Sequence, residues 1–194
     1  MKILGLTGSI AMGKSTASLM LKDLGWPVHS ADESVHKLYT RGGSAIAPLA
    51  LLVPQAVKEG LIQRPLLSKA IENDLSLLAK IEKIVHRWVD DDRNAFLKRL
   101  RRQGINRAAI DVPLLFESGL ERQCHWVFVV SAPKWIQQQR VLRRPDMTRE
   151  KWCYLRQRQM PDVEKRRRAD VVIPSGANKA HMRIALVKAL KRIQ

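Results

Sequence analysis

Residues 8–15 read GSIAMGKS and match the pattern G-x-x-x-x-G-K-[ST] of phosphate-binding loops. In such a loop, backbone N–H groups converge on phosphate oxygens, and the positive end of the following helix favours their negative charge. A lysine in the position of Lys14 can reach the β- and γ-phosphates, and a hydroxyl in the position of Ser15 can ligate Mg²⁺. The motif therefore predicts a site for a nucleoside triphosphate.

The stretches on either side of the motif support this interpretation. Residues 2–7, KILGLT, are apolar at nearly every position, which is typical of a parallel strand buried on both faces. After Lys14, apolar residues recur at helical spacing until Gly25. A strand that leads through a glycine-containing loop into a helix is the context that phosphate binding requires. The alternative is an ordinary strand-to-helix turn with an exposed lysine.

Two residues of the loop are unusual for a tight turn. If position 11 requires a positive φ, Ala11 costs on the order of 1 kcal/mol there. Met12 is expected to place a flexible apolar side chain at the rim of the loop. Both residues keep their backbone N–H, so the loop should still bind phosphate.

The rest of the chain alternates short apolar strands with helices. Further strands are predicted at residues 27–32, 107–116, 125–133 and 169–176, and helices at residues 134–144, 148–159 and 178–194. This alternation predicts an α/β fold with a five-stranded parallel sheet flanked by helices. Residues 33–102 are predicted to be mostly helical, without a strong strand signal, as a lobe inserted into a single domain over residues 1–194.

The composition points to anionic partners and a reducing compartment. The chain has 35 Lys and Arg against 18 Asp and Glu, a net charge of +17 that attracts nucleotides, phosphorylated metabolites, nucleic acid or acidic membranes. No apolar run approaches the roughly 18 residues that span a bilayer, and the first residues do not form a secretory signal. Cys124 and Cys153 are expected to be free thiols, each a small buried hydrophobe, in a cytoplasmic protein without a membrane partner.

Two aspartates lie at or near the carboxyl ends of predicted strands. Asp32 follows the second strand, at the carboxyl edge where parallel sheets bind ligands, and is our candidate to orient an acceptor hydroxyl and take its proton. Alternatively, Ser30 and Glu33 form a capping box, and Asp32 only favours the first turn of a helix. Asp111 ends a buried strand, where a carboxylate can hold Mg²⁺ directly or through water. Its alternative role is to cap the segment that follows.

Basic residues near the end of the chain could contact the triphosphate. Arg140 and Arg144 are four residues apart and would share one face of a helix, whereas Arg143 would face elsewhere. Guanidinium groups in a lid over ATP would stabilise charge on the γ-phosphoryl oxygens. Alternatively, Arg140 and Arg144 are each an ordinary charged residue on the solvated surface. The run Lys165–Arg168 is interpreted as a solvated helical face.

Five stretches together resemble the dephospho-coenzyme A kinase family. In chain order they are GLTGSIAMGKST, HSADESVHKLY, IVHRWV, IDVPLLFESGL and QQQRVLRRPDMTREKW…RQMPDVEKRRRADVVI. The resemblance covers residues 4–176. It implies a P-loop kinase with a helical acceptor-binding lobe at residues 33–102 and an arginine-rich lid at residues 140–168. The implied reaction is ATP-dependent phosphorylation of the ribose 3′-hydroxyl of dephospho-coenzyme A, the last step of coenzyme A biosynthesis.

The resemblance also implies a set of site residues. Catalysis is assigned to Asp32, Lys14 and Arg140. ATP binding is assigned to Gly8, Ala11, Met12, Gly13, Lys14, Ser15, Thr16 and Arg144. Acceptor binding is assigned to Asp32, His86, Pro113, Leu114, Leu115, Phe116 and Glu117. Mg²⁺, bound with ATP as co-substrate, is assigned to Ser15 and Asp111. Without the resemblance, residues 113–117 would be a core-packed loop and His86 a core histidine.

Some residues depart from the family pattern, and the phosphate loop also fits two other functions. The family loop usually reads close to G-G-I-G-S-G-K-S-T, so Ser9, Ala11 and Met12 are substitutions, and the usual His-Pro pair is His86-Arg87. Another small P-loop kinase, acting on a nucleoside or nucleoside monophosphate, is the alternative enzyme. A nucleic-acid-binding P-loop protein is the alternative of another class. Because basic and aromatic residues do not interleave, no specific nucleic acid partner is expected.

Overall fold

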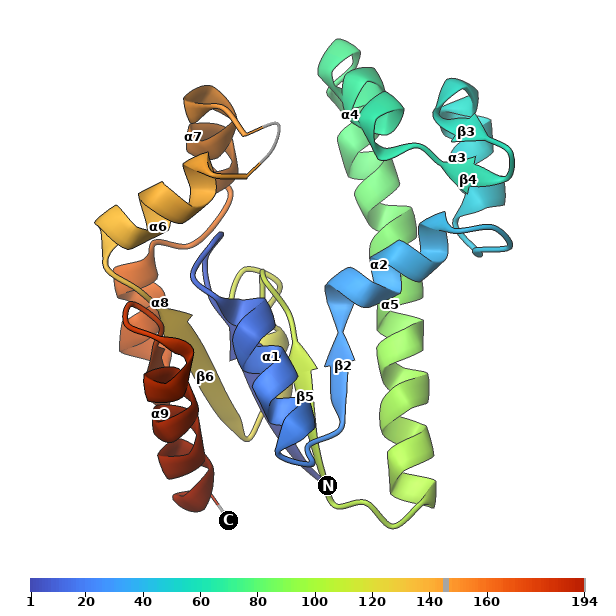
Figure 1. Cartoon of the computed structure of the whole chain (residues 1–194). Helices are drawn as coiled ribbons and strands as arrows, with labels where there is room; N and C mark the ends of the chain where they lie inside the picture. The colour runs from blue at the N-terminus through green and yellow to red at the C-terminus, as the bar shows by residue number, and fades with distance from the viewer. Residues whose placement is uncertain (145–146, 194) are drawn as a thin grey trace. The chain divides into compact units, whose positions relative to one another are not determined.

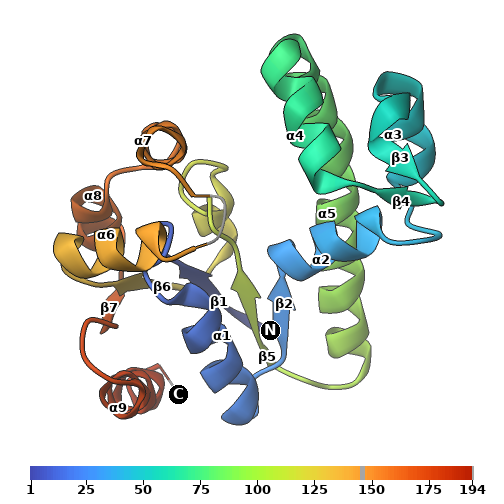
Figure 2. The same ribbon diagram turned by 45° about the horizontal axis from the view of Figure 1, so that its top comes forward.

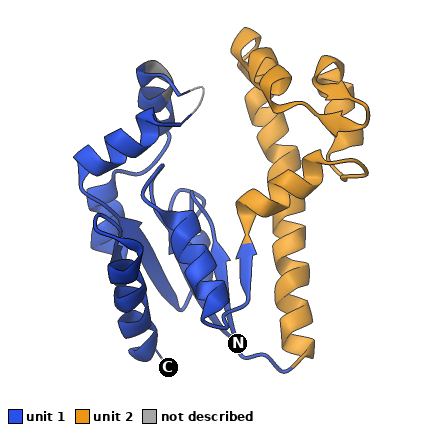
Figure 3. Ribbon diagram, in the orientation of Figure 1, with its two compact units in different colours: residues 1–29, 104–194 blue, residues 30–103 orange. Residues whose placement is uncertain are grey.

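The computed structural model describes residues 1–144 and 147–193. The chain forms two compact units (Figure 3). Residues 1–29 and 104–194 make up the first, which we call the sheet unit, and residues 30–103 make up the second, which we call the helical unit. The predicted boundaries of a substrate lobe at 33–102 and a lid at 140–168 remain predictions, and Pro145 and Asp146 of that lid lie outside the described residues.

A parallel sheet forms the centre of the sheet unit (Figure 1). Its strands are β1 (Lys2–Thr7), β2 (Val28–Ser30), β5 (Arg107–Asp111), β6 (Trp126–Ser131) and β7 (Val171–Pro174), in the order β2-β5-β1-β6-β7. The pairs β1–β5, β1–β6 and β6–β7 are parallel, and Leu6 of β1 lies opposite Asp111 of β5. The five predicted strands are therefore confirmed, although β5 ends at Asp111 and does not extend to residue 116 as predicted. The register brings the start of the phosphate loop beside Asp111.

Helices cover both faces of this sheet. On these faces lie α1 (Lys14–Asp23), α8 (Asp162–Arg168) and α9 (Lys179–Lys191), and the sheet unit also contains α6 (Lys134–Leu142) and α7 (Arg149–Gln157). Figure 2 shows α1 and α9 on one side of the sheet and α8 on the other. Leu21 of α1 and Leu186 of α9 pack with Leu6 and Phe128 of the central strands, and all four are completely buried. Burial on both faces explains why these strands are apolar throughout.

The helical unit contains four α-helices, a short 3-10 helix at Pro54–Ala56 and a hairpin. The helices are α2 (Ala31–Tyr39), α3 (Ile46–Leu52), α4 (Arg64–Asn73) and α5 (Ser76–Arg102), and the hairpin pairs β3 (Val57–Lys58) with β4 (Leu61–Ile62). The sequence did not indicate this hairpin, because two-residue strands are too short to show an alternating pattern. Glu59 and Gly60 form its turn with φ values of 52° and 72°, as a two-residue hairpin loop requires.

Helix α5 runs without interruption through His86 and Arg87, so the backbone is helical at this departure from the expected His-Pro pair. Both cysteines are free, as expected, but only Cys124 is partly buried, whereas Cys153 is exposed. The expectation of a buried Cys153 is wrong because α7 turns that side chain to its solvent face.

Among the helices described, none combines the length and the apolar character needed to cross a membrane.

Candidate active site

The phosphate loop connects β1 to α1 and depends on its two glycines. A Cβ atom on Gly8 would lie 2.7 Å from the carbonyl oxygen of Val130. Gly13 has a φ of 89° and begins α1. No side chain caps this helix in the described structure, and its first turn contains no acidic residue. The positive end of α1 is therefore available for an anion.

Ala11 occupies a left-handed backbone conformation, with a φ of 59°. Position 11 therefore has the positive φ that was considered from the sequence alone. A Cβ atom in this conformation crowds the following carbonyl oxygen, which costs about 1–2 kcal/mol. The loop keeps this conformation although it carries an alanine where a glycine would be free of strain.

Met12 does not lie at the rim of the loop, as the sequence had suggested. Its side chain is only 2% exposed and packs against Ala132 and Ile136. The Met12 sulfur accepts the N–H of Ala132 at 3.1 Å, and its carbonyl accepts the Ser175 hydroxyl at 2.5 Å. Met12 therefore anchors the loop to the segment after β6 and to the segment after β7.

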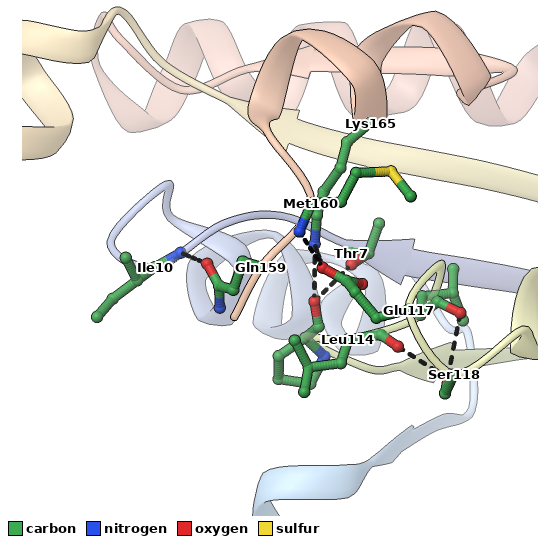
Figure 4. A network of polar contacts seen from close by, with 10 residues as sticks. Thr7, Ile10, Leu114, Glu117, Ser118, Gln159, Met160 and Lys165 are labelled. Atoms are coloured by element: carbon green, nitrogen blue, oxygen red, sulfur yellow. Dashed lines mark hydrogen bonds and ion pairs between the residues drawn. The ribbon is translucent and has the colours of Figure 1, made fainter. Parts of the chain in front are cut away.

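Two glutamines hold the peptide groups of Ile10. The Ile10 N–H donates to Gln159 Oε1 at 3.0 Å, as Figure 4 shows, and Gln137 Nε2 donates to the Ile10 carbonyl at 2.9 Å. Neither glutamine was predicted as a site residue, because nothing in the spacing of these residues indicates contact with residue 10. The loop is thus fixed from α6 and from the segment that follows α7.

Lys14 and Asp111 form a close ion pair. The distance from Lys14 Nζ to Asp111 Oδ1 is 2.6 Å, and both side chains are at least nine-tenths buried. The pair lies at the carboxyl ends of the adjacent strands β1 and β5, the edge at which parallel α/β sheets bind ligands. The structure therefore brings together the predicted phosphate-binding lysine and the predicted metal-binding carboxylate.

The two predicted lid arginines behave differently. Arg140 is half-buried on α6, and its guanidinium donates to the Ser175 carbonyl at 2.6 Å. Helix α6 ends at Leu142 with Arg143 as its C-cap, so Arg144 lies beyond the helix and is exposed. The prediction that Arg140 and Arg144 share one helical face is therefore wrong, because the helix is shorter than the apolar pattern indicated.

The predicted acceptor segment at residues 113–117 is mostly anchored in the protein. Leu115 and Phe116 are buried, and a Cβ atom on Gly5 would lie 2.8 Å from Leu115 Cδ2. Leu115 and Phe116 thus pack in the core, in agreement with the alternative interpretation of residues 113–117 as a core-packed loop. Pro113 and Leu114 are partly exposed, so a contact between their side chains and an acceptor remains a prediction.

Glu117 and Lys165 are joined in a network of polar contacts (Figure 4). Glu117 Oε1 accepts the N–H of Met160 at 2.7 Å and pairs with Lys165 Nζ at 3.0 Å. The Lys165 ammonium also donates to the Pro113 carbonyl at 3.1 Å, and its side chain is 0% exposed. The interpretation of residues 165–168 as a solvated face is therefore wrong for Lys165, which α8 directs toward the sheet.

Asp32 and His86 belong to the helical unit, whereas the other predicted site residues belong to the sheet unit. Ser30 caps α2 by accepting the N–H of Glu33 at 3.3 Å, so half of the predicted capping box is confirmed. Asp32 lies in the first turn of this helix and is exposed. His86 is exposed on α5, so its interpretation as a core histidine is wrong.

The oxygen donors of the sheet unit suit Mg²⁺ bound together with a nucleotide. Within the described residues, no group of three or more His, Cys, Asp or Glu side chains could hold a metal ion. Magnesium is usually bound by one or two carboxylates together with substrate phosphates and water, not by a protein cage. The Asp111 carboxylate and the Ser15 hydroxyl fit this pattern.

A phosphate loop between a central parallel strand and an uncapped helix, with a lysine–aspartate pair beside it, defines a P-loop kinase. The shikimate kinase of Acinetobacter baumannii has the same fold, with a TM-score of 0.52 and 17% identity over 100% of this chain and 93% of that one. A Thermus thermophilus protein of known structure is more similar, with a TM-score of 0.82 and 30% identity over 99% of this chain and 97% of that one.

Sequence comparison identifies the particular family. The family model described as dephospho-CoA kinase matches residues 2–181. The dephospho-CoA kinase of Paramagnetospirillum magneticum is 48% identical over 86% of this chain and 78% of its own length, and that of Jannaschia sp. is 49% identical over 88% and 86%. The dephospho-CoA kinase structure from Campylobacter jejuni matches with a TM-score of 0.73 and 26% identity over 100% of this chain and 98% of that one. The chain belongs to the dephospho-CoA kinase family.

Proposed function

We propose that this kinase transfers the γ-phosphoryl group of ATP to the ribose 3′-hydroxyl of dephospho-coenzyme A, which gives coenzyme A and ADP. The observation that carries the proposal is the buried Lys14–Asp111 pair at the start of α1, in a chain that matches the family over residues 2–181. The same match supports a role in the last step of coenzyme A biosynthesis.

The sheet unit holds the donor. Backbone N–H groups of the loop and of the first turn of α1 bind the phosphates, with the positive end of the helix behind them. An ammonium group carries three N–H donors, so Lys14 can contact phosphate oxygens and remain close to Asp111. Arg140, which Ser175 orients, supplies positive charge for the transferring group.

Asp32 acts on the acceptor in this proposal. Its exposed carboxylate follows β2 by two residues and takes the proton of the 3′-hydroxyl as the oxygen attacks the γ-phosphorus. The bond from the γ-phosphorus to the β–γ bridging oxygen breaks, and ADP leaves. Pro113 and Leu114 are proposed to contact the acceptor, and His86 is proposed to do so from α5.

Asp111 and Ser15 would hold Mg²⁺ bound with the triphosphate. When present, the ion neutralises charge that develops on the phosphate oxygens. Asp111 is suited to this because its carboxylate is directed toward the phosphate loop and toward Lys14.

Removal of divalent cations with a chelator should abolish turnover, and added Mg²⁺ should restore it. A rate unaffected by the chelator would contradict this part of the proposal.

We also propose that the enzyme works in the cytoplasm. The two free thiols support this location, because a reducing compartment keeps cysteines unpaired. Fractionation of producing cells, followed by detection of the chain in the soluble and membrane fractions, tests it.

A direct assay tests the reaction. Purified protein should convert dephospho-coenzyme A and ATP to coenzyme A and ADP in the presence of Mg²⁺. Nucleosides and nucleoside monophosphates serve as competing acceptors in parallel reactions. Turnover with those acceptors and none with dephospho-coenzyme A would favour the alternative enzyme over our proposal.

The role of Asp32 requires a control for its position in a helix. Asp32→Asn should lower kcat by about 100-fold or more, within the range attributed to general-base catalysis, and leave ATP binding intact. Glu33→Gln removes a charge from the same turn of α2 and therefore the same favourable interaction with the helix dipole. If both variants retain normal turnover, Asp32 is only a residue of the helix start.

A further inference from the structure

Lys165 is a buried charge within a run of basic residues. Its three neighbours, Arg166, Arg167 and Arg168, are exposed on α8, whereas the Lys165 side chain is 0% exposed. Burying an ammonium group is unfavourable unless hydrogen bonds and an opposite charge compensate for the lost water. Lys165 therefore differs from its exposed neighbours, and a contribution to surface charge does not explain it.

The contacts of Lys165 converge on the segment that follows Asp111. Lys165 Nζ donates to the Pro113 carbonyl at 3.1 Å and pairs with Glu117 at 3.0 Å. The same carboxylate oxygen of Glu117 accepts the N–H of Met160 at 2.7 Å. Lys165 thus holds both ends of residues 113–117, as Figure 4 shows for Glu117.

The Pro113 carbonyl also connects this segment to the phosphate loop. Thr7 Oγ1 donates to it at 3.1 Å, and Thr7 is the residue directly before Gly8. Pro113 is two residues after Asp111, whose carboxylate contacts Lys14. A single carbonyl oxygen therefore receives donors from the end of β1 and from α8, beside the lysine–aspartate pair.

We propose that Lys165 is a positioning residue for phosphoryl transfer, which acts by holding residues 113–117 in place relative to Asp111 and the phosphate loop. The inference rests on the proposed function, because that function assigns Pro113 and Leu114 to acceptor binding and Asp111 to Mg²⁺. Misplacement of reacting groups by about 1 Å can slow an enzyme by about 100-fold, so a buried anchor of this kind influences the rate without touching a substrate.

The variant Lys165→Met tests the anchor because it removes the charge and the donors and keeps an unbranched side chain. We expect kcat to fall by about tenfold or more and KM for dephospho-coenzyme A to rise by about tenfold. KM for ATP should change by about twofold or less, since Gln137, Gln159 and Ser175 still hold the loop. Lys191→Met, the same change at an exposed lysine of α9, should leave all three constants unchanged.

A second variant separates positioning from simple stabilisation. Lys165→Met alone leaves Glu117 without its buried partner and lowers Tm, whereas Lys165→Met with Glu117→Gln removes both charges. In the double variant the amide introduced at position 117 can still accept the Met160 N–H, so Tm should recover. The Pro113 carbonyl still lacks the Lys165 donor, so kcat should remain about tenfold below that of the wild type when assayed well below Tm. If Lys165→Met is too unstable to purify, the double variant carries the test.

The outcomes distinguish this inference from the proposed function. A wild-type protein that does not phosphorylate dephospho-coenzyme A would overturn the proposed function and the positioning role together. An active wild type with Lys165→Met kinetics unchanged would overturn only the positioning role. Recovery of both Tm and kcat in the double variant would also overturn it, because Lys165 would then serve stability alone.

Discussion

At the scale of the residue, the Lys14–Asp111 pair is the feature on which catalysis depends most directly. Lys14→Met should lower kcat by about 100-fold or more, because the substitution removes a positive charge from the phosphate site and keeps the apolar stem. Steady-state assays with saturating dephospho-coenzyme A measure this. Lys22→Met, at an exposed lysine of the same helix, is the matched control. A Lys14→Met enzyme within about threefold of the wild-type rate, on the order of experimental scatter, would contradict the assignment.

A second prediction at this scale concerns strain at Ala11. Ala11→Gly should raise the free energy of unfolding by about 1 kcal/mol, because relief of the left-handed conformation outweighs the extra freedom of glycine in the unfolded chain. In a chain of this size, such a gain raises Tm by about 2–4 °C, which calorimetry can detect. Ala17→Gly on α1 is the control and should lower Tm, since its helical conformation suits alanine. An unchanged or lower Tm for Ala11→Gly would show that the loop relieves the strain in another way.

At the scale of the element, the phosphate loop is held by structures far from it in sequence. Helix α6 contributes Gln137, the segment after α7 contributes Gln159, and the segment after β7 contributes Ser175. These contacts fix the carbonyl and N–H groups of Ile10 and the carbonyl of Met12. The loop conformation is thus supported by contacts within the protein.

Loss of one of these contacts should weaken ATP binding more than catalysis. Gln137→Ala should raise KM for ATP by about 3–10-fold with little change in kcat, because the Ile10 carbonyl loses a donor that holds the loop in its binding conformation. Gln139→Ala changes an exposed residue of the same helix and should have no effect. A large loss of kcat at unchanged KM would show that Gln137 acts in the transition state instead.

The elements also show where local sequence patterns are informative. The five strands could be predicted because burial on both faces leaves almost no polar residue in them. The end of α6 was predicted two residues too late, because Arg143 and Arg144 are good helix formers, although Pro145 disfavours a helical conformation at Arg144. The buried position of Lys165 gave no signal, because α8 is short and three of its last four residues are exposed arginines.

At the scale of the whole molecule, the net charge of +17 should accelerate the encounter with polyanionic substrates. We expect kcat/KM for dephospho-coenzyme A to fall by about tenfold as the salt concentration rises from about 10 to about 300 mM, because the Debye length shortens. The value of kcat should change little, since steering affects encounter and not the bound complex. A salt-independent kcat/KM would show that the charge serves another purpose, and a DNA titration at the same salt concentrations would test nucleic acid binding as that purpose.

The amino-acid sequence alone determined the class of fold and the location of the phosphate site. Both follow from local rules, since a buried strand must be apolar and a phosphate loop needs glycines and a lysine within eight residues. Only the tertiary structure decided that Met12 is an anchor, that Ser175 orients Arg140, and that Lys165 is buried against Pro113. These contacts join residues more than 30 positions apart, and their partners are chosen by how strands and helices pack, which no local pattern records.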